Sequence, residues 1–133
     1  MHLIIGGAYQ GKTEYAVEIL GVPWGGICVC DLSREPDLSA ACISHLERFV
    51  LRCMRQGRDP LTELHRTELE SKVLICEDIS CGVVPIDPEL RAWREATGRF
   101  LCALSREAAQ VTRVFCGLPL ALKGGGGAEE FSR

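Results

Sequence analysis

The sequence predicts an α/β fold with a mainly parallel sheet, and three observations lead to this prediction. Short apolar runs, each typical of a strand buried on both faces, alternate along the chain with segments of helical periodicity. Strands that alternate with helices are joined by right-handed crossovers, so neighbouring strands are parallel and helices cover the sheet. The length of 133 residues, with 47% apolar and 25% charged side chains, fits one soluble domain.

The first half of the chain alternates strand and helix. The predicted elements are a strand at 2–5 ("HLII"), a helix at 11–20, a strand at 27–30 and a helix at 40–56. Pro23 and its neighbouring glycines break the first helix before the second strand begins. The polar stretch "DLSREPDLS" is predicted to be a loop, and Asp37 or Ser39 can cap the helix that follows it.

The second half repeats this alternation. It is predicted to contain a helical segment at 61–70, a strand at 72–76, a helix at 88–109 and a strand at 111–116. The strand "KVLIC" is apolar after its first residue and has polar neighbours, as expected for a strand inside a parallel sheet. We therefore predict one domain over 1–123, followed by a flexible glycine-rich tail at 124–133.

The stretch "GGAYQGKT" directly follows the first strand and opens the first helix. It fits the pattern G-x-x-x-x-G-K-[ST], in which glycine amides surround phosphate oxygens at the positive end of a helix. Lys12 can reach the β- and γ-phosphates, and the Thr13 hydroxyl can bind magnesium. The predicted phosphate-binding loop consists of Gly6, Gly7, Ala8, Tyr9, Gln10, Gly11, Lys12 and Thr13.

This motif predicts a particular α/β architecture, a P-loop NTPase-like three-layer sandwich. It also predicts ATP or GTP as a substrate and Mg²⁺ as the cofactor. Such folds place an acid at the end of another strand to hold magnesium or its waters, and Glu77 and Asp78 directly follow "KVLIC". The alternatives are a glycine turn with an exposed lysine, and two solvated loop acids.

Charge and composition exclude several other classes. A net charge of −3, with no basic stripe carrying aromatic side chains, argues against nucleic-acid binding. The chain has no apolar run of the roughly 20 residues that span a membrane and no secretory signal, so we expect a cytoplasmic protein. The eight cysteines form no C-x-x-C pair, and apolar neighbours such as those of Cys76, Cys102 and Cys116 favour buried thiols over metal ligands.

Four stretches of the chain together resemble one protein family. They are "GGAYQGKT", "CEDISCGVVP", "WREATGRF" and "CGLPLALK". Their order and approximate spacing are similar to those of the bifunctional adenosylcobinamide kinase/adenosylcobinamide-phosphate guanylyltransferase family, which assembles the nucleotide loop of cobalamin. The resemblance covers residues 1–20 and about 73–123, which is over half of the chain.

The resemblance implies two reactions on a corrinoid substrate. A nucleoside triphosphate phosphorylates the aminopropanol hydroxyl of adenosylcobinamide, and GMP is then transferred from GTP to that phosphate through a guanylylated histidine. His45 is the only histidine in the right interval of the chain, and a neutral imidazole is a good nucleophile near pH 7. The alternative for His45 is a half-buried helix residue without a catalytic role.

The resemblance also assigns roles to other positions. Asp78 stands where the family has the Glu of its Asn-Glu motif, so it is the predicted catalytic acid and, with Thr13, the predicted magnesium ligand. The range 82–85 matches "GIVP". Four residues match the family's "FRDxAGR" motif: Arg94, Glu95, Gly98 and Arg99. The family assembles into small oligomers, so a homo-oligomer is also implied, and the apolar segment after His45 is either an interface or core.

The chain departs from the family pattern in its middle. It is shorter than typical members, the family's "DCLT"-type strand is not evident, and an apolar helical stretch follows His45 where the family has a basic loop that holds guanine nucleotide. Guanylyl transfer therefore stays an open question, and the general base is Glu77, Asp78 or Asp31. The alternative functions are a non-catalytic nucleotide-binding protein and an unrelated small-molecule kinase.

Overall fold

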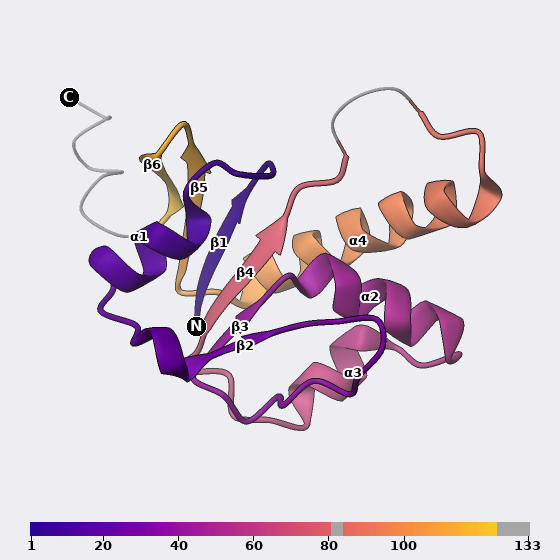
Figure 1. The fold of residues 1–133 in the computed structure, drawn as a ribbon, viewed down its shortest axis with the longest axis horizontal. Helices are drawn as coiled ribbons and strands as arrows, with labels where there is room; N and C mark the ends of the chain where they lie inside the picture. Colours follow the sequence, from indigo (N-terminus) through magenta and orange to yellow (C-terminus); the bar gives the residue numbers. More distant parts are fainter. Residues whose placement is uncertain (81–83, 125–133) are drawn as a thin grey trace.

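Six strands form one sheet in the computed structural model, which describes residues 1–80 and 84–124. The strands are β1 (His2–Gly6), β2 (Ile27–Val29), β3 (Cys42–Ser44), β4 (Val73–Glu77), β5 (Gln110–Phe115) and β6 (Leu118–Lys123). The helices are α1 (Lys12–Glu18), α2 (Leu46–Arg55), α3 (Pro60–His65) and α4 (Pro88–Glu107), with a 3₁₀ turn, η1, at Trp24–Gly26. Figure 1 shows how the helices are arranged around the sheet.

The strand order in the sheet is β2-β3-β4-β1-β5-β6. All neighbouring pairs are parallel except β5 and β6, which are antiparallel. The predicted α/β fold with a mainly parallel sheet is therefore confirmed. In the register of β1 and β4, Gly6 lies opposite Glu77, so the carboxyl ends of these two strands are side by side. Ligands of parallel sheets bind at such an edge.

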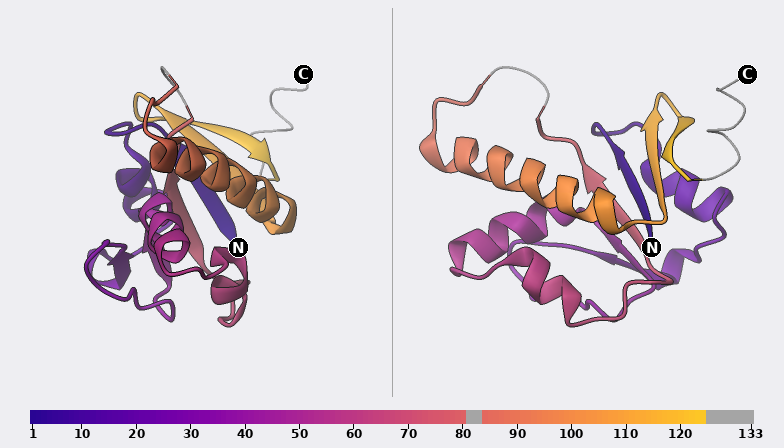
Figure 2. Two further views of the ribbon diagram at one scale, coloured as in Figure 1. Left: turned by 90° about the vertical axis from the view of Figure 1, so that its right-hand side faces the viewer. Right: turned by 180° about the vertical axis from the view of Figure 1, so that it is seen from behind.

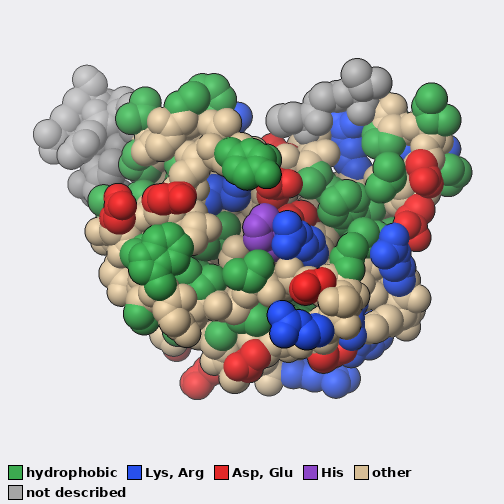
Figure 3. All heavy atoms as spheres, viewed as in Figure 1, with side chains coloured by type: hydrophobic (Ala, Val, Ile, Leu, Met, Phe, Trp, Pro, Cys, Tyr) green, Lys and Arg blue, Asp and Glu red, His purple; other side chains and the backbone are tan. Residues whose placement is uncertain are grey.

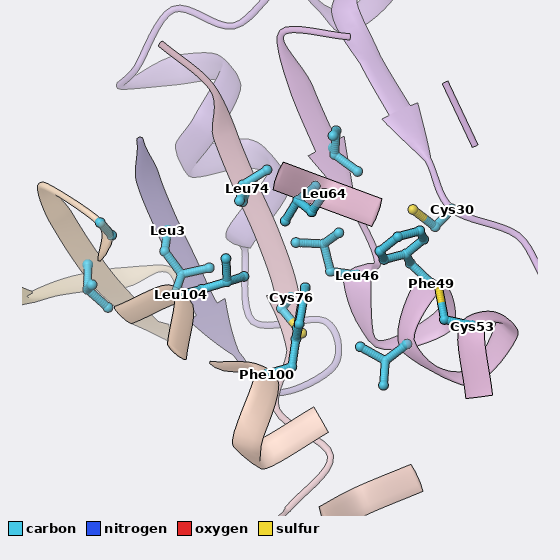
Figure 4. Packing of buried hydrophobic residues seen from close by; sticks show 14 residues of the cluster. Leu3, Cys30, Leu46, Phe49, Cys53, Leu64, Leu74, Cys76, Phe100 and Leu104 are labelled. Atoms are coloured by element: carbon cyan, nitrogen blue, oxygen red, sulfur yellow. The ribbon is translucent and has the colours of Figure 1, made fainter. Parts of the chain in front are cut away.

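Successive residues of each strand point to opposite faces of the sheet. In β1, Leu3 belongs to a core cluster with side chains of α2 and α4, whereas Ile4 belongs to a second cluster with Ala16 of α1. The larger cluster is drawn in Figure 4, where Phe49 and Phe100 fill the space beside β4. Helices α2 and α4 lie side by side over this face (Figures 1 and 2).

Helices α3 and α4 begin in the same way, with an aspartate cap followed by a proline. Asp59 precedes Pro60 and accepts a hydrogen bond from the Leu61 amide, and Asp87 precedes Pro88 and accepts one from the Glu89 amide. An aspartate cap satisfies an amide that has no partner in the helix, and proline suits the first helical position. The predicted start of the long helix at residue 88 is confirmed, while α3 ends at His65, earlier than the predicted residue 70.

The predicted helix over 40–56 is wrong in its first part, because Cys42–Ser44 forms strand β3. All three residues are buried, and they pair with β2 on one side and β4 on the other. His45 then adopts a left-handed conformation (φ 57°, ψ 47°), which separates the strand from α2. The apolar side chains of α2 belong to the core rather than to an exposed face: Leu46, Phe49, Val50 and Cys53 are buried.

A sixth strand, β6, follows β5 and was not predicted. Cys116 (φ 51°) and Gly117 (φ 76°) join the two strands, and Phe115 pairs with Leu118. Positive φ at both central residues is typical of a tight turn whose twist suits a hairpin. The apolar stretch at 118–123 is therefore an edge strand, with most of its side chains exposed.

The described cysteines differ in burial: four are buried, Cys28 is half-buried and two are exposed. Burial raises the pKa of Cys30 to about 12 and that of Cys42 to about 11, which keeps these thiols protonated in the core. Cys76 is buried as predicted, whereas Cys102 and Cys116 are exposed, contrary to prediction. Among residues 1–80 and 84–124, no helix is long and apolar enough to cross a membrane. Nearly all of the predicted tail, 125–133, lies outside the described residues.

The close packing of β1 against β5 yields a stability prediction. A Cβ atom on Gly6 would lie 2.5 Å from the Val114 carbonyl oxygen, whereas one on Gly7 would meet nothing closer than the Gln10 Cγ at 3.6 Å. We expect Gly6→Ala to lower the free energy of unfolding by about 1–3 kcal/mol, because a backbone atom must move. Gly7→Ala should change it by less than about 0.5 kcal/mol. Urea unfolding measures both, and equal losses would contradict this account.

Candidate functional site

The loop between β1 and α1 has a backbone that requires glycine at its end. Gly11 has φ 95°, and a Cβ atom there would lie 3.2 Å from the Gly117 Cα. Tyr9 also has a positive φ, of 57°, and its side chain is fully exposed. The loop thus turns sharply into α1, and its last residue lies against the β5–β6 turn.

The β5–β6 turn holds this loop in place through Gln10. The Gln10 side-chain oxygen accepts a hydrogen bond of 2.6 Å from the Cys116 amide, and its backbone carbonyl accepts one of 2.8 Å from the Gly117 amide. These contacts join residues about 106 positions apart. One sequence feature pointed to these contacts, because "CGLPLALK" belongs to the motif set that resembles the family.

Lys12 is the first residue of α1, and only 8% of it is exposed. Its Nζ donates a hydrogen bond of 2.5 Å to the Gly7 carbonyl, which places the ammonium group against the loop. Its aliphatic carbons lie close to Gly6, where an added Cβ would be 3.4 Å from Cδ. The fold therefore fixes a positive charge at the loop, next to the half-buried Thr13.

A cavity of about 480 Å³ opens at this loop. Its lining comes from three neighbouring strands and the segments that follow them. These are residues 8–14 after β1; Ser44 at the end of β3 with His45 and Arg48 beyond it; and Ile75 and Glu77 of β4. Figure 3 shows the hollowed face of the molecule, where a histidine lies among basic and acidic side chains. The structure thus brings the predicted loop and His45 together in one site.

The two acids at the end of β4 line different cavities. Glu77 lines the same cavity as Thr13, whereas Asp78 lines a second cavity of about 210 Å³ with Arg94 and Gly98. Side chains alternate across a strand, so adjacent acids face opposite sides of the sheet. The structure brings Glu77, rather than the predicted Asp78, to the cavity of Thr13.

Asp78 instead orders the chain after β4. Its amide donates a hydrogen bond of 2.8 Å to the Gly6 carbonyl, and its carboxylate accepts one of 2.9 Å from the Ser80 amide. Arg94 also donates a hydrogen bond to the Ser80 carbonyl. These contacts hold the second cavity between β4 and α4. Of the predicted "GIVP" match at 82–85, residues 82 and 83 lie outside the described residues.

The other predicted site residues lie elsewhere. Glu95 and Arg99 form an exposed ion pair with an N–O distance of 2.6 Å on α4. Asp31 is exposed after β2 and lines neither cavity. Hydrogen bonds from the Ser33 amide and hydroxyl lower the pKa of Asp31, so it stays ionised in this turn.

Sequence reasoning missed the residue that holds His45. Glu47 is only 2% exposed, and its Oε2 lies 2.8 Å from the His45 Nδ1. Its Oε1 accepts a hydrogen bond of 3.0 Å from the Glu77 amide at the end of β4. Burial is the largest single influence on Glu47 and raises the pKa of its carboxyl. The hydrogen bonds from His45, from the Glu77 amide and from its own amide, together with the charge interaction with His45, outweigh burial and place the pKa below its ordinary value.

Arg48 was also missed, and it adds a second positive charge to the cavity. Its guanidinium donates a hydrogen bond of 3.4 Å to the Cys30 carbonyl and lies 3.9 Å from the Glu47 carboxylate. Its side chain is 44% exposed, so the guanidinium can meet a ligand in the cavity. Lys12 and Arg48 together make the site suitable for an anion.

The arrangement fits magnesium bound together with phosphate. Thr13 and Glu77 line the same cavity, and a hydroxyl and a carboxylate are oxygen groups of the kind that Mg²⁺ binds. Within residues 1–80 and 84–124, no group of three or more His, Cys, Asp or Glu side chains could hold a metal ion by itself. Mg²⁺ is commonly bound in this way, by one or two protein oxygens, substrate phosphates and waters.

Comparison with known proteins adds no family to this description. No protein-family model and no curated protein matches the chain. The function is therefore inferred from the residues of the site and from the motifs of the sequence.

Proposed function

We propose that the chain has a P-loop fold and is a magnesium-dependent kinase that phosphorylates adenosylcobinamide from a nucleoside triphosphate. One observation carries this proposal: Lys12, Thr13 and Glu77 line a single cavity at the glycine loop. Phosphoryl transfer needs positioned cations and little covalent chemistry from the protein. Lys12 would bind the β- and γ-phosphates, while Thr13 and Glu77 would hold magnesium, which would supply charge stabilisation.

One further observation supports the corrinoid acceptor. Asp78 belongs to one motif of the resemblance and Arg94 and Gly98 belong to another, yet all three line one cavity beside α4. An unrelated kinase would leave the convergence of these motif residues unexplained.

Guanylyl transfer is a second candidate activity, favoured by the position of His45 in the same cavity as the loop. In that step an imidazole nitrogen would attack the α-phosphorus of GTP and release pyrophosphate, and GMP would then pass to the corrinoid phosphate. The closeness of His45 to Lys12 and Thr13 would let one nucleotide site serve both reactions.

The kinase proposal predicts the behaviour of two lysine variants. Lys12→Ala should reduce ATP-dependent phosphorylation of adenosylcobinamide on the order of 100-fold, because a cation aimed at the transferred phosphate is lost. Lys123→Ala removes the same charge from the exposed edge strand and should keep full activity. Phosphorylated product is measured by mass spectrometry. Nucleotide binding without product in the wild-type chain would favour the non-catalytic alternative.

The two acids after β4 give a paired test. Glu77→Gln should lower kcat at least tenfold and raise the magnesium concentration needed for half-maximal rate, because a carboxylate beside Thr13 is lost. Asp78→Asn should leave the magnesium dependence unchanged, since its carboxylate lines the other cavity. Titration of activity with Mg²⁺ compares them, and a shift seen only in Asp78→Asn would return the metal-binding role to Asp78.

The guanylyl-transfer candidate has its own readout. The chain is incubated with GTP labelled at the α-phosphate and Mg²⁺, denatured, and examined by mass spectrometry for a phosphoramidate on His45. Acid-labile, base-stable label that is absent from His45→Ala would establish the covalent step. A chain that makes phosphorylated corrinoid but carries no label has the kinase activity alone.

A further inference from the structure

Two groups beside the phosphate loop have no role in the kinase step described above. They are the His45 imidazole, which lines the cavity, and the buried Glu47 carboxylate behind it. His45 follows β3 and Glu47 lies in the first turn of α2, so both belong to the wall opposite the loop. Their arrangement determines which nitrogen of the ring can react.

An ionised carboxylate can only accept hydrogen bonds. Because Glu47 Oε2 lies 2.8 Å from His45 Nδ1, the hydrogen of a neutral ring is on Nδ1, and the lone pair is on Nε2. Among the described residues, the protein provides no hydrogen-bond partner for Nε2. The His45 side chain is 31% exposed, so a ligand in the cavity can reach this nitrogen.

Two further hydrogen bonds hold Glu47 in place, and His45 has an unusual backbone conformation. Glu47 Oε1 accepts a hydrogen bond from the Glu77 amide, and the Glu47 carbonyl accepts one of 2.7 Å from Trp93 Nε1 on α4. The backbone of His45 is left-handed, a conformation that costs a residue with a Cβ about 1–2 kcal/mol. Backbone strain of this kind clusters at functional sites, where the surrounding structure enforces it.

We propose that His45 is the base for the acceptor hydroxyl and that Glu47 is the residue that positions it. The proposal rests on the kinase function proposed above. The hydroxyl donates its proton to Nε2 as its oxygen forms a bond to the γ-phosphorus. The bond between that phosphorus and the β–γ bridging oxygen breaks, and the nucleoside diphosphate leaves with its electron pair. The imidazolium, stabilised by Glu47, then returns its proton to solvent.

Glu47→Gln tests the positioning role. The glutamine carbonyl can keep the hydrogen bond from the Glu77 amide, which turns its NH₂ group toward His45 Nδ1 and moves the ring hydrogen to Nε2. We expect kcat to fall roughly 100-fold or more, with the KM for ATP changed less than about twofold. Glu89→Gln breaks an exposed ion pair with Arg55 instead and should keep full activity. An unchanged kcat in Glu47→Gln would overturn the proposal.

Nitrogen-15 NMR of the ligand-free chain tests the pair without any turnover. The wild type should show the ring hydrogen on Nδ1, and Glu47→Gln should show it on Nε2. A hydrogen on Nε2 in the wild type would overturn the assignment, even in a chain that phosphorylates no corrinoid. A chain with the expected tautomer and no kinase activity would instead contradict the proposed function.

His45→Gly provides a variant that does not depend on how glutamine fits at position 47. Glycine suits the left-handed conformation at position 45, and its lack of a side chain leaves room for free imidazole. We expect kcat to fall roughly 100-fold and added imidazole to restore part of it, while ATP binding persists. Full activity without imidazole, or no restoration in a chain that still binds ATP, would overturn the base role of His45.

Discussion

The site depends on the two hydrogen bonds that the buried Glu47 carboxylate makes with His45 and with the Glu77 amide. Glu47 joins the end of β4, the start of α2 and the His45 ring, and its backbone carbonyl binds Trp93 of α4. Burying a charge is unfavourable unless hydrogen bonds compensate, and removing one partner of a buried pair costs about 3–5 kcal/mol. The lowered pKa of Glu47 indicates that compensation here is sufficient. Hydrogen bonds therefore hold the wall of the cavity where the imidazole lies.

The opposite wall of the cavity is the loop between β1 and α1, which the β5–β6 turn holds in place. The loop between β1 and α1 rests on the β5–β6 turn, because Gln10 accepts hydrogen bonds from two amides of that turn and Gly11 approaches Gly117 closely. Parallel pairing of β3, β4 and β1 then brings both walls to the same edge of the sheet. The antiparallel strand β6 supports the loop through this turn. It therefore contributes to the site without lining the cavity.

Much of this arrangement could be predicted from local sequence. Alternating apolar runs and helical segments predicted the mainly parallel sheet, and the glycine-rich stretch connects the first strand to the first helix as predicted. Strand β3 could not be separated from α2, because a three-residue buried strand followed by apolar residues has the same helical periodicity. Which of Glu77 and Asp78 points to the cavity of Thr13 depends on how β4 pairs with its neighbours, and this pairing could not be read from the sequence. One signal for Glu47 existed: it precedes the buried Val50 and Leu51 by three and four residues, on the inner side of α2.

The His45–Glu47 pair has a strained backbone and a buried charge, which are unfavourable on their own, and a catalytic role would explain why such a pair is present. Phosphate binding needs only the loop amides and cations such as Lys12 and Arg48, all of which lie outside this pair. A left-handed histidine and a desolvated carboxylate both reduce stability unless other interactions offset them. A protein that only bound nucleotide would gain nothing from fixing the hydrogen of the ring on Nδ1. Under the proposed function, proton transfer from a hydroxyl requires an unprotonated Nε2 in the cavity, and the geometry of the pair is the reason why we propose catalysis rather than binding alone.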